Sequence, residues 1–379
     1  MKNVFLLGAT GSIGKSALEV IEANSSKFRL IGIAYGKNHK AANEIIKKHN
    51  PKFIFSQTYE LKHHGKKDAA KLLNRYISST EVDVVISGIS GISGLESTYQ
   101  AVKSGKKILL ANKESIVAGG DILIPLSRKT GAKIIPIDSE HNAINQCINY
   151  SKKNLLEVDK ITITASGGPF ISKKLQALTN VSVRDALQHP TWNMGAKITI
   201  DSATLINKCL EIIEAAYLFN LKSEKLDVIV HPQSIVHSLV TYKDGSTLAH
   251  LSNPSMTIPI ANALGVGILR KRVGVSFEEL FQQGTQLTFK QLPKDRHLCF
   301  NLARTVINKK GNAGVVFNAA NEIAVQAFMN QKIKFLDIYE VIYRTFKAIS
   351  WSKVNNIQDI FHFDNSARKY AVKVLKSLT

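Results

Sequence analysis

The sequence predicts an α/β protein whose N-terminal part is a doubly wound parallel sheet. Short apolar runs alternate with helical stretches over this part of the chain, which is the pattern of strand–helix–strand units. The first run is followed by a glycine-rich turn, and several later runs end in polar clusters, as strands do where ligands bind in such sheets. The expected strands are 4–7, 30–34, 51–56, 82–88, 107–111 and 132–137.

Composition excludes several classes of protein. The chain has 379 residues, 44% of them hydrophobic and 21% charged, which is ordinary for a globular protein of two or three domains. No apolar run approaches the roughly 20 residues that span a bilayer, and no secretory signal precedes the first strand. We therefore expect a cytoplasmic protein with no membrane partner. Its three cysteines, Cys147, Cys209 and Cys299, form no disulfide or metal-binding pattern.

The net charge of +21 raises the possibility of a nucleic-acid partner. The lysines are spread along the chain, without a basic arm or a patch interleaved with aromatic residues, so we expect no nucleic-acid function. The charge would still attract a small anionic substrate. A basic nucleic-acid-binding protein with a relic nucleotide fold remains the alternative, and a gel shift at physiological salt separates the two.

The turn at 8–14 has the spacing G-x-x-G-x-x-G between an expected strand and a helix. Such a turn lets the backbone approach a pyrophosphate, which faces the N–H groups of the helix start; a plain glycine turn is the alternative. The second strand ends in Gly36, Lys37 and Asn38 instead of an acidic residue. A cation and an amide suit a 2′-phosphate, so we expect NADP(H) rather than NAD(H).

Two carboxylates, Asp138 and Glu140, follow the strand expected at 132–137. If the chain stays extended, alternate side chains share a face, and paired carboxylates suit Mg²⁺ or Mn²⁺. A solvated acidic turn is the alternative. Asn112, Lys113 and Glu114 end the preceding strand in the same way, where either a ligand site or an ordinary helix start is consistent with the pattern.

Three further stretches carry polar groups that could bind an anion. Ser166 and two glycines follow a strand expected at 160–165, as in a phosphate-binding turn or a structural one. The segment 189–197 has no period and could be a closing lid or a surface loop. We expect residues 201–204 to begin an amphipathic helix whose polar face carries Asn207, Lys208, Glu211 and Glu214. That face is either solvated or binds an anion and supplies a third metal carboxylate.

The pattern of the remaining sequence predicts a strand at 227–230, a hairpin of 235–242 with 247–251, and helices from 299 onward. We expect four segments: an NADPH-binding domain at 1–137, a catalytic and metal-binding domain at 138–274 with its lid at 189–197, a linker at 275–298, and a helical domain at 299–379.

Eight stretches together resemble the 1-deoxy-D-xylulose 5-phosphate reductoisomerase family of the non-mevalonate route to isoprenoids. They run in family order along nearly the whole chain, and 189–211 is the most specific. They are GATGSIG at 8–14, YGKN at 35–38, ANKES at 111–115, PIDSEHNAI at 136–144, SGGPF at 166–170, HPTWNMGAKITIDSATLINKCLE at 189–211, HPQSIVHS at 231–238 and FNAANEIAV at 317–325. The chain departs at Cys209, where the family usually has glycine, and around 91–94.

The resemblance implies the role of each motif residue. The cofactor-binding residues would be Thr10, Gly11, Ser12, Ile13, Gly36, Lys37, Asn38, Asn112, Glu114 and Gly195. The metal ligands would be Asp138, Glu140 and Glu211. The catalytic residues would be Lys113, Ser139, Glu140 and His189. The substrate-binding residues would be Lys113, Ser139, Glu140, Ser166, His189, Ser202, Asn207, Lys208 and Glu211. Trp192 would lie in the lid, and a homodimer is expected.

The implied reaction converts 1-deoxy-D-xylulose 5-phosphate, a small phosphorylated sugar, into 2-C-methyl-D-erythritol 4-phosphate. Mn²⁺ or Mg²⁺ would chelate the ketone and hydroxyl oxygens during rearrangement, and NADPH would then deliver hydride. An NADP-linked dehydrogenase without rearrangement is the alternative. It would keep the glycine turn but would not need the three carboxylates together.

Overall fold

The computed structural model describes residues 1–151, 153, 155–192, 194–266, 277–282, 284 and 286–378. The chain divides into two compact units. The first consists of Met1–Ser115, Leu123–Asn142 and Ser255–Val273, and the second of Ile116–Ile122, Ala143–Pro254 and Gly274–Thr379. The four boundaries expected from the sequence remain predictions.

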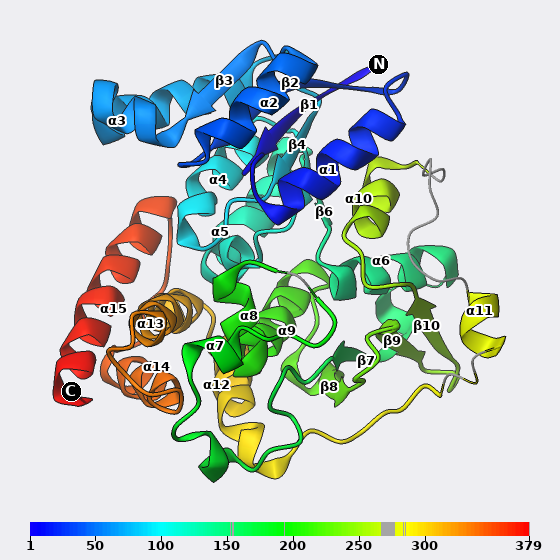
Figure 1. Cartoon of the computed structure of the whole chain (residues 1–379), viewed down its shortest axis with the longest axis vertical. Coiled ribbons are helices and arrows are strands. Elements are labelled where there is room, and N and C mark those ends of the chain that lie inside the picture. The colour runs from blue at the N-terminus through cyan, green and yellow to red at the C-terminus, as the bar shows by residue number, and fades with distance from the viewer. Residues whose placement is uncertain are drawn as a thin grey trace. The chain divides into compact units, whose positions relative to one another are not determined.

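A six-stranded parallel sheet forms the centre of the first unit (Figure 1). Its order, β3-β2-β1-β4-β5-β6, is that of a doubly wound dinucleotide-binding fold and confirms the predicted class. The strands are β1 (Lys2–Leu7), β2 (Phe28–Tyr35), β3 (Phe53–Ser56), β4 (Val84–Ser87), β5 (Lys107–Leu110) and β6 (Lys133–Pro136). The four central strands, β1, β2, β4 and β5, are mostly apolar and buried because helices cover both faces of the sheet, whereas β3 and β6 at its two edges are partly exposed.

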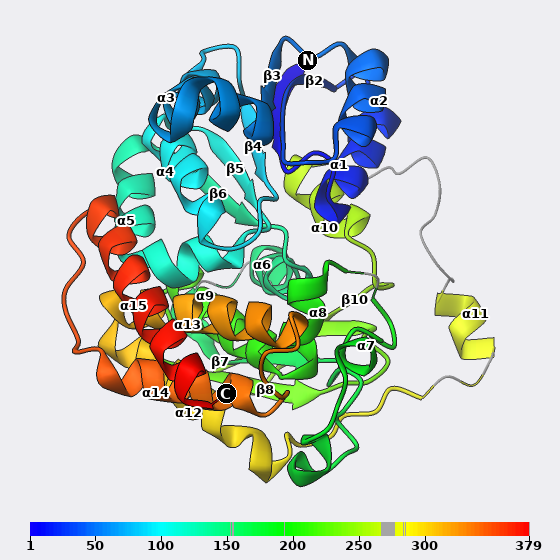
Figure 2. The same ribbon diagram turned by 60° about the vertical axis from the view of Figure 1, so that its left-hand side comes forward.

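The helices of this unit lie on opposite faces of the sheet. Figure 2 shows α1 (Ser12–Ala23) and α2 (His39–His49) on one side, and α3 (Gln57–Ser78) and α4 (Leu95–Lys103) on the other. The chain later returns to this unit as α10 (Thr257–Leu264), which packs beside α1 and completes its apolar core.

The strand order reverses between β1 and β4, and Gly8 makes the turn there possible. Its φ is +81°, and a Cβ at this position would lie 2.6 Å from the carbonyl oxygen of Gly88 after β4. Gly14 in α1 is equally confined, because a Cβ there would lie 2.2 Å from the oxygen of Ala9. Both glycines therefore permit close approach of backbone segments.

The second unit contains a four-stranded mixed sheet of order β10-β9-β7-β8. Its strands are β7 (Val158–Ala165), β8 (Leu226–Val230), β9 (Val236–Tyr242) and β10 (Thr247–Leu251). β9 and β10 form the predicted antiparallel hairpin, and β9 also pairs antiparallel with β7, whereas β7 and β8 are parallel. β10 is an edge strand with mostly exposed side chains.

Helices pack on this sheet and on one another in a single apolar core. α9 contacts β7 and β8, α12 packs against α9, and α13 packs against α8, α14 and α15 (Figure 1). The bounds are α5 (Lys113–Thr130), α6 (Ser139–Ser151), α7 (Val183–Ala186), α8 (Ala196–Ala203), α9 (Ile206–Leu218), α11 (Phe277–Gln282), α12 (His297–Lys309), α13 (Asn312–Met329), α14 (Asp337–Ala348) and α15 (Ile357–Leu378). The predicted C-terminal helical region is confirmed.

The strand argument for the two carboxylates is wrong in its geometry. β6 ends at Pro136 and α6 begins at Ser139, so Glu140 lies in the first turn of a helix and Asp138 immediately precedes it. Alternation along an extended chain therefore does not relate the two side chains. A helix start explains the polarity here, because negative side chains are favoured at a helix N-terminus.

The helix expected to begin at 201–204 is also placed differently. Asp201 and Ser202 lie in the last turn of α8, and a new helix, α9, begins at Ile206. Leu205 joins them with a φ of +62°, a conformation that leucine rarely adopts, and its side chain is buried. Helical periodicity continues across this break, so the sequence pattern did not reveal it.

Two other predicted segments lie partly outside the described residues. These are the lid, at residue 193, and the linker, at residues 275, 276, 283 and 285. Within the part of the chain that is described, no helix is long and apolar enough to cross a membrane.

Candidate active site

Most predicted site residues of the first unit lie at one edge of its sheet. Parallel strands end at the same edge, and the turns after β1, β2, β5 and β6 carry these residues. They are Thr10, Gly11, Ser12, Ile13, Gly36, Lys37, Asn38, Asn112, Lys113, Glu114, Asp138, Ser139 and Glu140.

The turn after β1 leaves the first amides of α1 available to an anion. Gly11 is the N-cap residue, no side chain caps the helix, and its first turn holds no acidic residue. Gly11 and Ser12 are exposed. An uncapped helix start beside a glycine turn is a site where a phosphate is stabilised by N–H groups and the helix dipole.

The turn after β2 presents a cation at the edge of the sheet. Lys37 is exposed, and Asn38 uses its Oδ1 to accept a hydrogen bond from the amide of Ala41, 3.1 Å away, which caps α2. The side-chain carbonyl of Asn38 thus caps α2. Lys37 is the residue in this turn that carries a positive charge. The turn between β2 and α2, residues 36–38, contains no carboxylate that would repel a phosphate.

Asn112 joins the turns that follow β4 and β5. Its Nδ2 donates to the carbonyl oxygens of Ile89 and Gly91, at 2.5 and 2.9 Å, while its Oδ1 accepts from the Ser115 amide at 2.8 Å and so caps α5. Glu114 is only 7% exposed. This helix start is therefore buried, which the sequence left open.

Lys113 and Asp138 form a buried ion pair. Lys113 Nζ lies 2.5 Å from Asp138 Oδ2, and their side chains are 5% and 10% exposed. His141, fully buried on the first turn of α6, has its Nδ1 4.0 Å from the same oxygen. Ser139 Oγ donates to Glu140 Oε2 at 2.5 Å. Two carboxylates, an ammonium group and a hydroxyl thus follow β5 and β6.

The second unit holds a comparable pair within one helix. Lys208 Nζ lies 2.6 Å from Glu211 Oε2, and the amide of Asn207 donates to the other oxygen of Glu211. Glu211 is 1% exposed and Glu214 fully buried. The polar face of α9 is therefore not a solvated surface, and its role in binding an anion and a metal ion stays a prediction.

His189 brings the two predicted phosphate-binding serines together. Its Nε2 lies 3.1 Å from the hydroxyl oxygens of both Ser166 and Ser202. Its Nδ1 accepts from the backbone amides of Thr191 and Trp192, at 3.2 and 2.9 Å. A ring nitrogen that accepts two N–H groups carries no proton, so the proton is on Nε2, which faces the serines.

Burial, together with the positive charge of Lys208, lowers the pKa of His189 to about 4. The imidazole is therefore neutral near pH 7 and donates one hydrogen bond from Nε2. The sequence placed His189 in the lid but did not predict this contact with both serines. It depends on two chain segments that only the tertiary structure joins.

Two glycines follow Ser166, and the second of them fits closely against the end of α8. Gly167 and Gly168 have φ values of +87° and +65°, and a Cβ on Gly168 would lie 2.8 Å from the oxygen of Ser202. The Gly168 amide donates to Ser166 Oγ at 3.3 Å. A turn with two positive φ values and a hydroxyl is suited to an anion.

The residues predicted to bind the cofactor and the metal are divided between the two units. Gly195, the N-cap of α8, belongs to the second unit, whereas the other predicted cofactor-binding residues belong to the first. Asp138 and Glu140 likewise lie in the first unit and Glu211 in the second.

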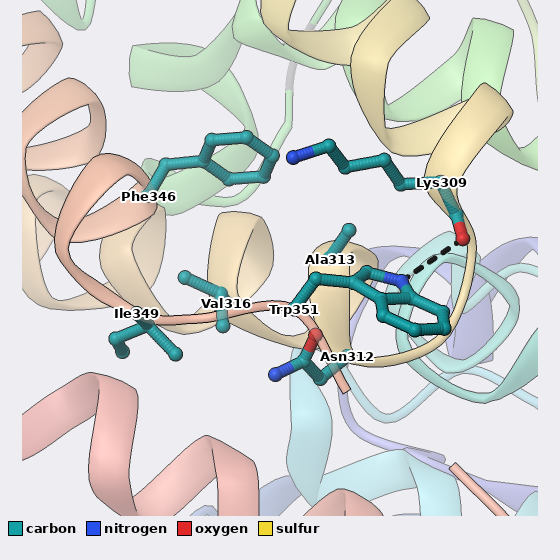
Figure 3. Close-up of a pocket in the computed structure, with 7 residues that line it drawn as sticks. All are labelled: Lys309, Asn312, Ala313, Val316, Phe346, Ile349 and Trp351. Atoms are coloured by element: carbon teal, nitrogen blue, oxygen red, sulfur yellow. Dashed lines mark hydrogen bonds between the residues drawn. The ribbon is translucent and has the colours of Figure 1, made fainter. Parts of the chain in front are cut away.

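A small cavity in the second unit contains none of the predicted residues (Figure 3). The Trp351 indole closes one side and donates to the Lys309 carbonyl at 3.0 Å. The cavity is lined by Lys309, Asn312, Ala313, Val316, Phe346, Ile349 and Trp351.

Comparison with known proteins identifies the family. Residues 4–120 match the family model described as 1-deoxy-D-xylulose 5-phosphate reductoisomerase, and residues 134–219 and 251–370 match two models for C-terminal domains of the same enzyme. The reductoisomerase of Francisella tularensis subsp. novicida is 44% identical over 98% of both chains. This chain belongs to the 1-deoxy-D-xylulose 5-phosphate reductoisomerase family.

Solved structures of the family have the same fold. A DOX-P reductoisomerase crystallised with NADPH, fosmidomycin and magnesium is 35% identical, covers 99% of this chain and 98% of its own, and gives a TM-score of 0.88. The Zymomonas mobilis reductoisomerase in complex with NADPH is 37% identical over the whole of both chains, with a TM-score of 0.87. The resemblance found in the sequence motifs is therefore confirmed.

Proposed function

We propose that this chain catalyses the NADPH-dependent conversion of 1-deoxy-D-xylulose 5-phosphate into 2-C-methyl-D-erythritol 4-phosphate. The observation that carries the proposal is the 44% identity to a reductoisomerase over 98% of both chains. The buried Lys113–Asp138 and Lys208–Glu211 pairs lie in the motifs that match the family, so the polar residues the reaction needs are present and ordered.

The proposed cofactor site is the edge of the first unit's sheet. The uncapped start of α1 and the turn at 8–14 would bind the pyrophosphate, and Lys37 would contact the 2′-phosphate of NADPH. Asn112 fixes the turns after β4 and β5 at the same edge. Gly195, the N-cap residue of α8, would also contact the cofactor.

The proposed metal ligands are Asp138, Glu140 and Glu211. Carboxylate oxygens are the donors that Mg²⁺ and Mn²⁺ prefer, and these residues provide three of them, so the donor set fits the ion. Each of Asp138 and Glu211 already accepts from a lysine, which fixes its orientation. When bound, the cation polarises the substrate carbonyl and NADPH supplies the hydride.

The protein's own groups bind and orient the substrate. Lys113 and Ser139 would contact its oxygens near the reacting carbons, and Ser166, Ser202, Asn207 and Lys208 would bind its phosphate end. His189 is neutral and would donate its Nε2 proton to the phosphate instead of acting as a cation. Phosphate binding would thus position the reacting end, and the lid, with Trp192, would exclude water.

Identification of the product tests the activity. The purified enzyme is incubated with NADPH, Mg²⁺ and 1-deoxy-D-xylulose 5-phosphate, and the product skeleton is determined by NMR. We expect the branched 2-C-methyl-D-erythritol 4-phosphate. An unbranched alcohol would instead identify a dehydrogenase that does not rearrange its substrate.

We also propose that Mn²⁺ can replace Mg²⁺, that the protein is cytoplasmic, and that it is a homodimer.

The edge strand β10 supports self-association, because Leu248 and Leu251 are 39% and 37% exposed on a strand with one unpaired side in the sheet. Light scattering should give twice the 41.8 kDa of one chain. A mass of one chain at micromolar concentration would contradict the dimer.

A further inference from the structure

A buried hydrogen bond connects the C-terminal helices to the proposed phosphate site. Asn321 of α13 donates from Nδ2 to Asp201 Oδ1, 2.9 Å away in the last turn of α8. The other carboxylate oxygen of Asp201 lies 2.8 Å from Lys197 Nζ, one turn earlier in the same helix. Asp201 is 1% exposed and Asn321 fully buried, so water does not compete for this contact.

Asp201 directly precedes Ser202, whose hydroxyl faces His189. The backbone leaves α8 here through a strained residue, because Leu205 has a φ of +62°. A second contact fixes the same junction, since the Tyr339 hydroxyl of α14 donates to the Thr204 carbonyl at 2.9 Å. Two C-terminal helices therefore restrain the short segment that carries Ser202.

We propose that Asn321 is a positioning residue for phosphate binding, acting through Asp201 on the orientation of Ser202. This inference rests on the proposed function of Ser202 and His189. Asn321 does not touch the substrate. Its amide fixes the carboxylate of Asp201, and this fixes the rotation of the last turn of α8 and hence the direction of the neighbouring hydroxyl.

The chain offers a matched control on the same helix. Asn318 is also fully buried, and its Nδ2 donates at 3.0 Å to Glu322 of its own helix, not to α8. Truncation of either asparagine removes one buried amide from α13. Only the Asn321 variant removes a contact to the segment before Ser202.

The test compares Asn321→Ala with Asn318→Ala. We expect Asn321→Ala to raise the KM for 1-deoxy-D-xylulose 5-phosphate and the Kd for inorganic phosphate about tenfold, with the KM for NADPH unchanged. Asn318→Ala should change each of these constants less than twofold. Phosphate affinity is measured by calorimetry and needs no turnover, so it reports on Asn321 even if the proposed reaction is wrong.

Two results would overturn the inference. One is a phosphate Kd in Asn321→Ala equal to that of the unmodified enzyme, and the other is an equal loss of phosphate affinity in both variants, which indicates general destabilisation. If Asn321→Ala does not fold, Asn321→Ser retains a polar group that is too short to reach Asp201, and the same two criteria apply to it.

Discussion

The two units present their buried carboxylates in different ways. Asp138 of the first unit pairs with Lys113, which follows a neighbouring strand of the sheet. Glu211 of the second unit pairs with Lys208, three residues earlier on the same helix. The first pair depends on the parallel order of the sheet, whereas the second depends on one helical turn. The difference shows that similar buried pairs arise from tertiary topology in one unit and from local helical geometry in the other.

The largest effect is expected where the lysine also serves the reacting atoms. Lys113→Met leaves the carboxylate of Asp138 buried without its ammonium partner and should lower kcat/KM about 10³-fold. Lys208→Met should lower kcat/KM only about 10²-fold, because Ser166, Ser202 and Asn207, the other residues proposed to bind the phosphate, remain. Steady-state kinetics measures both variants.

Lys103→Met, which changes an exposed lysine on α4, is the control and should be neutral. Equal losses in the Lys113 and Lys208 variants would remove the functional distinction between the two pairs.

Within the first unit, an added methyl group should destabilise the turn at Gly8 more than the turn at Gly11. Gly8→Ala places a Cβ 2.6 Å from the oxygen of Gly88 at a φ of +81°, so the free energy of unfolding should fall by about 2–3 kcal/mol. In Gly11→Ala the new Cβ has no neighbour nearer than 3.4 Å, so the free energy of unfolding should fall by less than about 1 kcal/mol. Urea denaturation of the two variants gives the difference, and similar values would contradict the close approach.

The pattern of apolar runs predicted the first unit well because its central strands, β1, β2, β4 and β5, are mostly buried and successive strands are separated by helices. The doubly wound class and the ligand-binding edge follow from that pattern, whereas the order of the strands comes from the structure. The turn at Leu205 could not be predicted, because the strain of a positive φ at a leucine is compensated by tertiary packing. The contacts of His189 also depend on segments distant in sequence.

The second unit should show a neutral histidine in its pH dependence. Since burial holds the pKa of His189 near 4, below the ordinary value of 6.5, its imidazole stays uncharged at pH 5.5–8. His189→Gln should lower kcat/KM about 10- to 100-fold without changing the shape of the pH profile. If protonation of the substrate phosphate lowers kcat/KM at acidic pH, it does so equally in the unmodified enzyme and in His189→Gln.

The sign of the stability effect follows from the same pKa. The unfolded state binds the proton more tightly, so His189 lowers the free energy of unfolding as the pH falls from about 6.5 towards 4. The kinetic prediction has its own contrary outcome. If the unmodified enzyme shows an inflection near pH 6–7 in its kcat/KM profile and His189→Gln lacks it, His189 acts as a cation.

The smallest effect concerns cofactor choice in the first unit. Lys37→Ala should reduce the ratio of kcat/KM for NADPH over NADH about tenfold, because the 2′-phosphate loses its cationic partner. Lys40→Ala, an exposed change on α2, should leave the ratio unchanged. An unchanged ratio in Lys37→Ala would show that another group selects the cofactor.

The central proposal is that Asp138, Glu140 and Glu211 bind one divalent cation, and a Mn²⁺ titration followed by electron paramagnetic resonance tests it directly. Glu211→Gln keeps the size of the side chain and removes its charge, so Mn²⁺ should bind about 100-fold more weakly than to the unmodified enzyme. Glu340→Gln, at an exposed ion pair, should leave the affinity unchanged. An unaltered Kd for Mn²⁺ in Glu211→Gln would contradict the account.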